Sequence, residues 1–199
     1  MNARALATLR TPPLSAIAIG GSAGGIEAVS TLLAALPERL AVPILVSLHI
    51  KADSRAQWPV VFRASRAPVF EAEDGLLARP GAVYVAPPDY HLLVDVGSRL
   101  SLSADERVNM ARPSLDVMFE SAAWAYERGT LGVVLSGANA DGAAGLAAIR
   151  ARGGRAWVQS PDTALAAMMP RAAIAAVPDA LVLSLDEMAA ALSAWGHEE

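Results

Sequence analysis

Short, continuously apolar runs alternate along the chain with longer Ala-rich segments, and this alternation restricts the fold more than any other feature. The clearest runs are residues 16–19, 44–48, 131–135 and 180–183. Strands that are buried on both faces are apolar throughout, whereas strands with one wet face alternate. Strand–helix–strand units connect by right-handed crossovers into parallel sheets. We therefore predict an α/β fold, a doubly wound and mostly parallel sheet with helices on both faces.

The segments between these runs carry helical signals. Residues 26–36 have apolar side chains at helical spacing and are followed by Pro37, which stops a helix. Further helices are expected at residues 53–65, 113–127, 145–152, 164–176 and 186–195. Two apolar segments, residues 91–94 and 99–102, flank Gly97 and predict a small antiparallel hairpin, which we place at the edge of the sheet.

The chain of 199 residues has the length of one domain. Its apolar content of 54% is too high for a disordered protein. Residues 1–13 carry no clear core pattern, so we expect a flexible N-terminal tail there. Residues 14–195 are expected to form a single domain.

Composition excludes several classes of function. The net charge of −4 leaves no cationic excess for nucleic acid. The chain has no cysteine, which removes disulfides, Cys-ligated zinc and a thiol nucleophile. The three histidines are scattered, so no metal site is expected. No apolar run reaches the roughly 18 residues of a membrane helix and no signal peptide begins the chain, so we expect a cytoplasmic protein without membrane insertion.

Three polar residues follow three of the predicted strands. Ser22 lies in a glycine-rich loop after the first strand, His49 follows the second, and Asp141 lies in the loop after residues 131–135. Sites in such sheets lie at the carboxyl ends of strands, where the strand order reverses. Ser, His and Asp are the groups that a serine hydrolase needs: a nucleophile, a base with a suitable pKa and an acceptor that orients the base. Free N–H groups where the next helix begins could stabilise an oxyanion.

Each of these residues also has a simpler interpretation. The loop around Ser22 could hold a phosphate or only make a turn, although it matches neither the dinucleotide fingerprint nor a P-loop. His49 could be structural, and Asp141 could cap the following helix. Residues 20–24 also match the G-x-S-x-G elbow of α/β-hydrolases, but that order of residues requires Asp141 or Asp162 as the acid and His197 as the base. The order Ser22, His49, Asp141 suits the sheet better.

The chain resembles the catalytic domain of the CheB-type protein-glutamate methylesterases of bacterial chemotaxis. The resemblance covers about residues 16–192 and depends on an ordered set of motifs. They are residues 19–28, the strand end at His49, residues 71–75, residues 80–87 with Asp89 and His91, residues 112–119, residues 132–137 with 141–145, and residues 169–172.

The resemblance implies hydrolysis of γ-glutamyl methyl esters on the signalling helices of chemoreceptors, with release of methanol, and often deamidation of receptor glutamine. It implies no cofactor. The catalytic triad of the family falls on Ser22, His49 and Asp141. Backbone N–H groups near Ala23, Gly24 and Ala138 are the expected oxyanion donors.

Several positions depart from the pattern of the family. Ala23 replaces the usual Ser or Thr, Ala138 the usual Met, and Leu48 the usual Gln. The residues before the first strand are too few for the phospho-receiver domain that the family commonly carries, so we expect the chain to act without one. Two alternatives follow from these departures: a partner-binding module with weakened catalysis, and an esterase for another small ester. The sequence predicts no oligomeric state.

Overall fold

A seven-stranded, fully parallel sheet forms the centre of the molecule in the computed structural model, which describes residues 2–195. The strand order is β3-β4-β2-β1-β7-β8-β9, and every neighbouring pair runs parallel. The strands are β1 (Ala16–Gly21), β2 (Ile44–Leu48), β3 (Val69–Glu71), β4 (Val83–Val85), β7 (Thr130–Val134), β8 (Arg155–Gln159) and β9 (Leu181–Leu183). All residues of β1, β2, β7 and β8 are buried, as their mainly apolar character predicts, and the polar residues at both ends of β8, Arg155 and Gln159, are buried as well.

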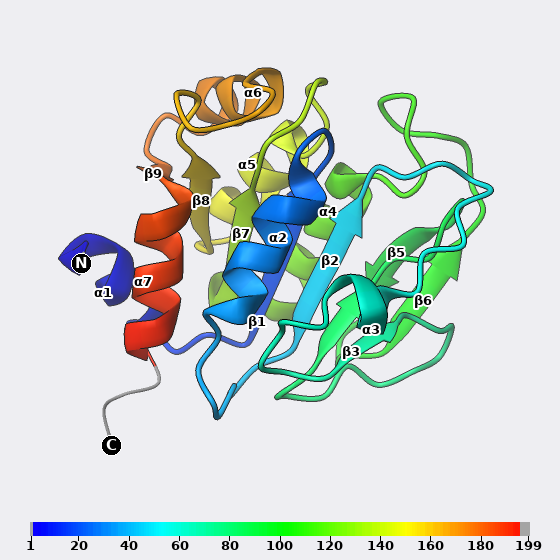
Figure 1. The fold of residues 1–199 in the computed structure, drawn as a ribbon, viewed down its shortest axis with the longest axis horizontal. Coiled ribbons are helices and arrows are strands. Elements are labelled where there is room, and N and C mark those ends of the chain that lie inside the picture. The colour runs from blue at the N-terminus through cyan, green and yellow to red at the C-terminus, as the bar shows by residue number, and fades with distance from the viewer. Residues whose placement is uncertain (1, 196–199) are drawn as a thin grey trace.

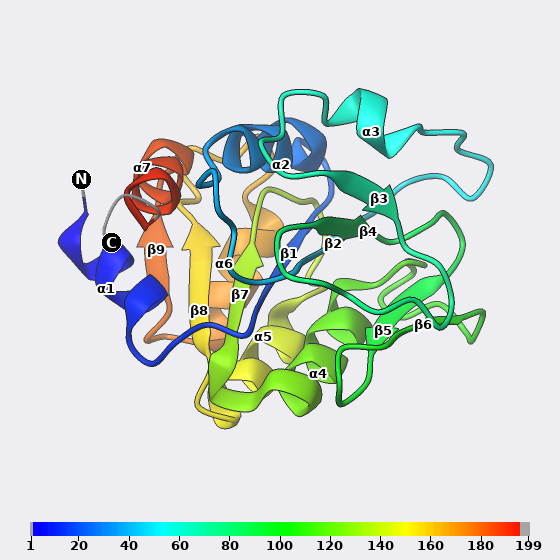
Figure 2. The same ribbon diagram turned by 90° about the horizontal axis from the view of Figure 1, so that it is seen from below.

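Helices cover both faces of this sheet, which confirms the doubly wound architecture (Figures 1 and 2). The helices are α1 (Ala3–Arg10), α2 (Gly25–Ala34), α3 (Trp58–Val61), α4 (Leu115–Tyr126), α5 (Ala143–Ala151), α6 (Met168–Ala176) and α7 (Leu185–Trp195), with a 3-10 turn η1 (Glu127–Gly129) after α4. One apolar core lies between the sheet and α1, α2 and α7, and a second lies between the sheet and α4, α5 and α6.

The predicted hairpin forms beside the β3–β4 end of the main sheet (Figures 1 and 2). Strands β5 (His91–Val94) and β6 (Leu100–Ser103) pair antiparallel around Gly97, which has a φ of 89°. They make a separate two-stranded sheet, whereas the edges of the main sheet are β3 and β9. The apolar side of the hairpin, including Leu92 and Leu100, is buried in the core that also contains α4. The hairpin is therefore held by packing on α4 and not by hydrogen bonds to an edge strand of the main sheet.

The N-terminal segment is not the flexible tail that we expected. Helix α1 buries Ala5, Leu6 and Leu9 and packs on α7. The guanidinium of Arg155 donates hydrogen bonds to the carbonyl oxygens of Thr8 (2.6 Å) and of Pro12 (2.7 Å). The segment is ordered by this tertiary contact, which its own short sequence pattern does not reveal.

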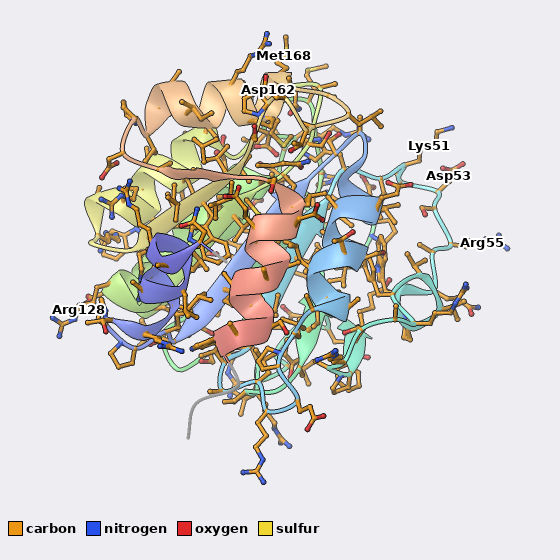
Figure 3. The ribbon with its side chains drawn as sticks, turned by 60° about the vertical axis from the view of Figure 1, so that its left-hand side comes forward. Lys51, Asp53, Arg55, Arg128, Asp162 and Met168 are labelled. Atoms are coloured by element: carbon orange, nitrogen blue, oxygen red, sulfur yellow. The ribbon has the colours of Figure 1, made fainter. Side chains whose placement is uncertain are left out.

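Two predicted helices are shorter than expected. Of residues 53–65 only α3 is helical, and Lys51, Asp53 and Arg55 project into solvent from the loop before it (Figure 3). Of residues 164–176 the part from Met168 onward is helical. Pro170 thereby falls in the first turn of α6, where a missing backbone N–H costs no intrahelical hydrogen bond.

The chain reverses its winding direction next to β1. The first crossover leads from β1 to β2, and the later part of the chain returns to the other side of β1 as β7. Functional sites of such sheets lie outside the carboxyl ends of the strands at this point. Ser22, His49 and Asp141 all follow strands that meet there.

Candidate active site

Ser22 and His49 follow neighbouring positions of two paired strands. Gly21 of β1 lies in register with Leu48 of β2, and the N–H of His49 donates to the carbonyl oxygen of Gly21 at 3.2 Å. Each of the two residues is thus the first beyond its strand. Within the described chain, neither Ser22 Oγ nor His49 Nδ1 has a hydrogen-bond partner. Both atoms are therefore available for new hydrogen bonds.

His49 contacts Asp141, which lies 92 positions further along the chain. The distance between His49 Nε2 and Asp141 Oδ2 is 2.7 Å. The Asp141 side chain is fully buried, and that of His49 is 14% exposed. A carboxylate at Nε2 favours the tautomer that carries its proton there, which leaves a lone pair on Nδ1. Nδ1 is consequently the nitrogen that can serve as a base.

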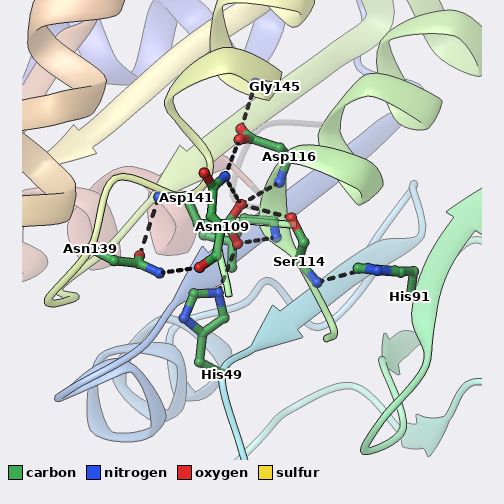
Figure 4. A network of polar contacts seen from close by, with 9 residues as sticks. His49, His91, Asn109, Ser114, Asp116, Asn139, Asp141 and Gly145 are labelled. Atoms are coloured by element: carbon green, nitrogen blue, oxygen red, sulfur yellow. Dashed lines mark hydrogen bonds and ion pairs between the residues drawn. The ribbon is translucent and has the colours of Figure 1, made fainter. Parts of the chain in front are cut away.

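The Asp141 carboxylate is held at the N-terminus of α4 (Figure 4). Its Oδ1 accepts from Ser114 Oγ (2.7 Å) and Asn109 Nδ2 (2.9 Å), and its Oδ2 also accepts from the N–H of Leu115 (2.7 Å). Burial alone would raise the pKa of Asp141, but the hydrogen bonds from His49, Asn109, Ser114 and Leu115 outweigh it and lower the pKa to about 2. Asp141 is therefore ionised at neutral pH.

Asp141 is a helix cap, but not of the helix that the sequence suggests. It precedes α5, yet its carboxylate caps α4. The N–H of Gly145 in α5 donates instead to Asp116 Oδ1 at 2.7 Å. Asp116 Oδ2 accepts from Asn109 Nδ2 at 2.8 Å. Burial, followed by the nearby charge of Asp141, raises the pKa of Asp116.

Ser136 joins the loop of Ser22 to the loop after β7. The Ser22 N–H donates to the Ser136 carbonyl oxygen at 2.8 Å. The Ser136 hydroxyl donates to the carbonyl oxygen of Ala23 (2.6 Å) and accepts from the N–H of Ala166 (2.8 Å). Because the Ser136 side chain is buried, these bonds are partly screened from water and hold the loop that carries Ser22.

Free N–H groups lie next to Ser22. Gly24 is the N-cap of α2 with a φ of 77°, and a Cβ there would lie 2.8 Å from Leu165 Cβ. Glycine is therefore required at this position. The N–H groups of Ala23, Gly24 and Ala138 make no hydrogen bond with any described residue. The positive end of α2 adds a favourable field for an anion at the same place.

The other sequence candidates lie elsewhere. Asp162 is exposed in the loop before α6 (Figure 3), and His197 lies outside the described residues. His91 is buried, and its Nδ1 accepts from the N–H of Ser114 at 3.1 Å while its Nε2 donates to the carbonyl oxygen of Glu106 at 3.1 Å. His91 thereby fastens the start of α4 to the preceding loop.

Sequence reasoning missed four residues of this site: Asn109, Ser114, Asp116 and Ser136. Ser114 carried a signal as a helix-capping residue after Pro113, and Asp116 and Ser136 lie within the motifs 112–119 and 132–137, whereas Asn109 carried none. Across residues 2–195 no three His, Cys, Asp or Glu side chains gather as metal ligands would. None of the helices in that range has the length and apolar character needed to cross a membrane.

Comparison with known proteins identifies the family. Residues 17–192 match the family model described as CheB methylesterase. The chain belongs to the CheB methylesterase family. The crystal structure of the CheB methylesterase catalytic domain of Thermotoga maritima is similar to this fold, with a TM-score of 0.84 and 27% identity over 92% of this chain and 98% of that chain.

Two sequence relatives in the CheB methylesterase family differ in how much of their length this chain covers. A Leptospira interrogans protein, provisionally named protein-glutamate methylesterase/protein-glutamine glutaminase, is 47% identical over 87% of this chain and 91% of its own length. The protein-glutamate methylesterase FrzG of Myxococcus xanthus is 38% identical over 92% of this chain and 55% of its own length. The chain thus covers most of the first relative and about half of the second.

Proposed function

We propose that this chain is a serine esterase that removes methyl esters from glutamate side chains of chemoreceptors, with Ser22, His49 and Asp141 as its catalytic triad. The observation that carries the proposal is the 2.7 Å contact between His49 and Asp141 at the end of the strand next to that of Ser22. The names of its relatives support the substrate class.

In the first half of the proposed reaction, His49 Nδ1 takes the proton of Ser22 as Ser22 Oγ attacks the ester carbonyl carbon. The negative charge that develops on the carbonyl oxygen is stabilised by N–H groups of Ala23, Gly24 and Ala138. The tetrahedral intermediate collapses when the bond to the methoxy oxygen breaks. His49 protonates this oxygen, and methanol leaves.

In the second half, water hydrolyses the glutamyl ester of Ser22. His49 takes a proton from the water, the hydroxide attacks the ester carbonyl, and the proton returns to Ser22 as glutamate is released. Asp141 stays ionised and stabilises the imidazolium in both halves, as its low pKa allows. A glutamine side chain would react by the same steps with ammonia as the leaving group.

The surroundings of Ser22 support a protein substrate. Leu165 is 81% exposed and Met168 is 60% exposed, and both lie in the segment that packs beside Gly24 and Ser136. Exposed apolar side chains of this size next to a site suit a protein surface better than a small polar ester. A chemoreceptor signalling helix would offer such a surface, and its location implies a cytoplasmic enzyme. We infer that residues 14–195 form one catalytic domain, which the family match supports, and that α1 packs on it through α7.

The test is methanol release from a methylated chemoreceptor by the purified chain and by its Ser22→Ala variant. We expect release by the parent and a loss of about 10⁶-fold in the variant. The unfolding midpoint should not change, because Ser22 Oγ has no hydrogen bond to lose within the described chain. Equal rates in both proteins would overturn the proposed nucleophile. Receptor binding without release, or activity only on a generic methyl ester, would overturn the proposed substrate.

A further inference from the structure

The side-chain amide of Asn109 lies between two buried carboxylates. Asn109 Nδ2 donates one hydrogen bond to Asp141 Oδ1 at 2.9 Å and one to Asp116 Oδ2 at 2.8 Å (Figure 4). A primary amide nitrogen has two N–H groups, so both are used. Asp116 and Asp141 are 6% and 0% exposed, which makes these charge-assisted bonds strong.

The loop that carries Asn109 is itself held in place. The guanidinium of Arg112 binds Asp89 at 2.8 Å and donates to the carbonyl oxygen of Ala104 at 2.6 Å. Asn139 Nδ2 donates to the carbonyl oxygen of Asn109 at 3.3 Å. The loop therefore holds the Asn109 amide in the orientation that the two carboxylates need. Forming the two hydrogen bonds then costs little side-chain entropy.

The charged groups around Asp141 explain why the Asn109 amide is needed to keep the Asp141 carboxylate in place. His49 lies on one side of its carboxylate and Asp116 on the other, and Glu120 faces Asp116 from further along α4. Two carboxylates in one buried site repel each other unless donors lie between them. If the amide is removed, Asp141 Oδ1 keeps two donors among the described residues, Ser114 Oγ at 2.7 Å and the longer bond from the N–H of Asp116 at 3.3 Å. A rotation of the carboxylate would then draw Oδ2 away from His49.

We propose that Asn109 is a positioning residue of this enzyme: its amide holds the Asp141 carboxylate in the orientation that faces His49. The proposal rests on the proposed triad. Asn109 does not touch the reacting atoms, and it acts through Asp141 alone.

The test uses glycine at two adjacent positions. Asn109 has a φ of 51° and Met110 a φ of 64°, so glycine suits both backbones. Asn109→Gly removes the amide and keeps the turn. Met110→Gly is the matched control, because it adds the same flexibility to the same loop while the side chain that it removes is 89% exposed.

Methanol release from methylated chemoreceptor and proton NMR are measured for both variants, with Ser22→Ala and His49→Ala beside them. We expect Asn109→Gly to lower kcat about 10- to 100-fold at unchanged KM. The low-field proton signal of His49 Nε2–H, assigned by its absence in His49→Ala, should shift or vanish in Asn109→Gly. Met110→Gly should keep both kcat and this signal.

Three outcomes would overturn the proposal. A kcat for Asn109→Gly equal to that of the parent would show that the amide is dispensable. Equal losses in Asn109→Gly and Met110→Gly would assign the effect to loop flexibility. Full activity of Ser22→Ala would instead remove the proposed triad, and with it the basis of this inference, so the two failures are distinguishable.

Discussion

Asp141 and Asp116 exchange helix caps. Asp116 lies in the first turn of α4 and accepts from the N–H of Gly145 in α5, whereas Asp141 lies before α5 and accepts from the N–H of Leu115 in α4. The two helices cross so closely that a Cβ on Gly145 would lie 2.6 Å from Phe119 Cβ. The carboxylate that orients His49 therefore also stabilises the packing of α4 on α5. The proposed catalytic geometry and the stability of the fold therefore depend on the same group.

Asp141 should make folding stability depend on pH. Its pKa falls from the ordinary 3.8 to about 2 on folding, so its ionised form stabilises the folded state above pH 3.8. That contribution, about 2 kcal/mol, is lost as the pH falls from 3.8 to about 2. Urea unfolding of the parent and of Asp141→Asn checks this, because the difference in unfolding free energy should shrink over that range.

The contribution of Asp116 to folding stability changes with pH in the opposite direction. Its pKa is raised on folding, so its protonation in the folded state adds stability as the pH falls. Because Asp116 is present in both the parent and Asp141→Asn, the comparison must use the difference between their unfolding free energies at each pH. A difference that stays constant down to about pH 2 would contradict the assigned role of Asp141.

Ser136→Ala should lower both stability and kcat. The substitution leaves the half-buried N–H of Ala166 without its acceptor and releases the carbonyl oxygen of Ala23. Loss of each such hydrogen bond costs about 0.5–1.5 kcal/mol, and the freed loop carries Ser22. Thermal unfolding and methanol release measure the two effects. Ser160→Ala is the control, since its side chain makes no hydrogen bond with the described residues. An unchanged kcat in Ser136→Ala would show that the loop needs no such support.

Met168→Glu should weaken action on a receptor without weakening the chemistry. Met168 is 60% exposed at the first position of α6, where a carboxylate is compatible with the helix dipole, so stability should not fall (Figure 3). We expect KM for methylated receptor to rise and the rate on a small methyl ester to stay the same. A rise in KM on both substrates would place the defect in the site itself and contradict the docking role.

Much of the fold follows from local patterns. The unbroken apolar runs predict the parallel sheet, and the spacing of apolar residues predicts α2, α4, α5 and α7 to within a few residues. The packing of the hairpin on α4 and the order in residues 2–13 could not be predicted. Both depend on contacts with distant segments, such as the bonds from Arg155 to the carbonyl oxygens of Thr8 and Pro12.

The candidate site likewise has features that local sequence predicts and features that depend on distant contacts. The amino-acid sequence by itself determined that Ser22, His49 and Asp141 follow three strands, because strand ends are set by local hydrophobicity and glycine. Only the tertiary structure decided that Asp141 binds Nε2 of His49, that its carboxylate caps α4 rather than α5, and that Asn109 bridges it to Asp116. The physical reason is that a buried carboxylate must find donors wherever the packed chain brings them, and these donors come from 25 to 92 positions away along the chain.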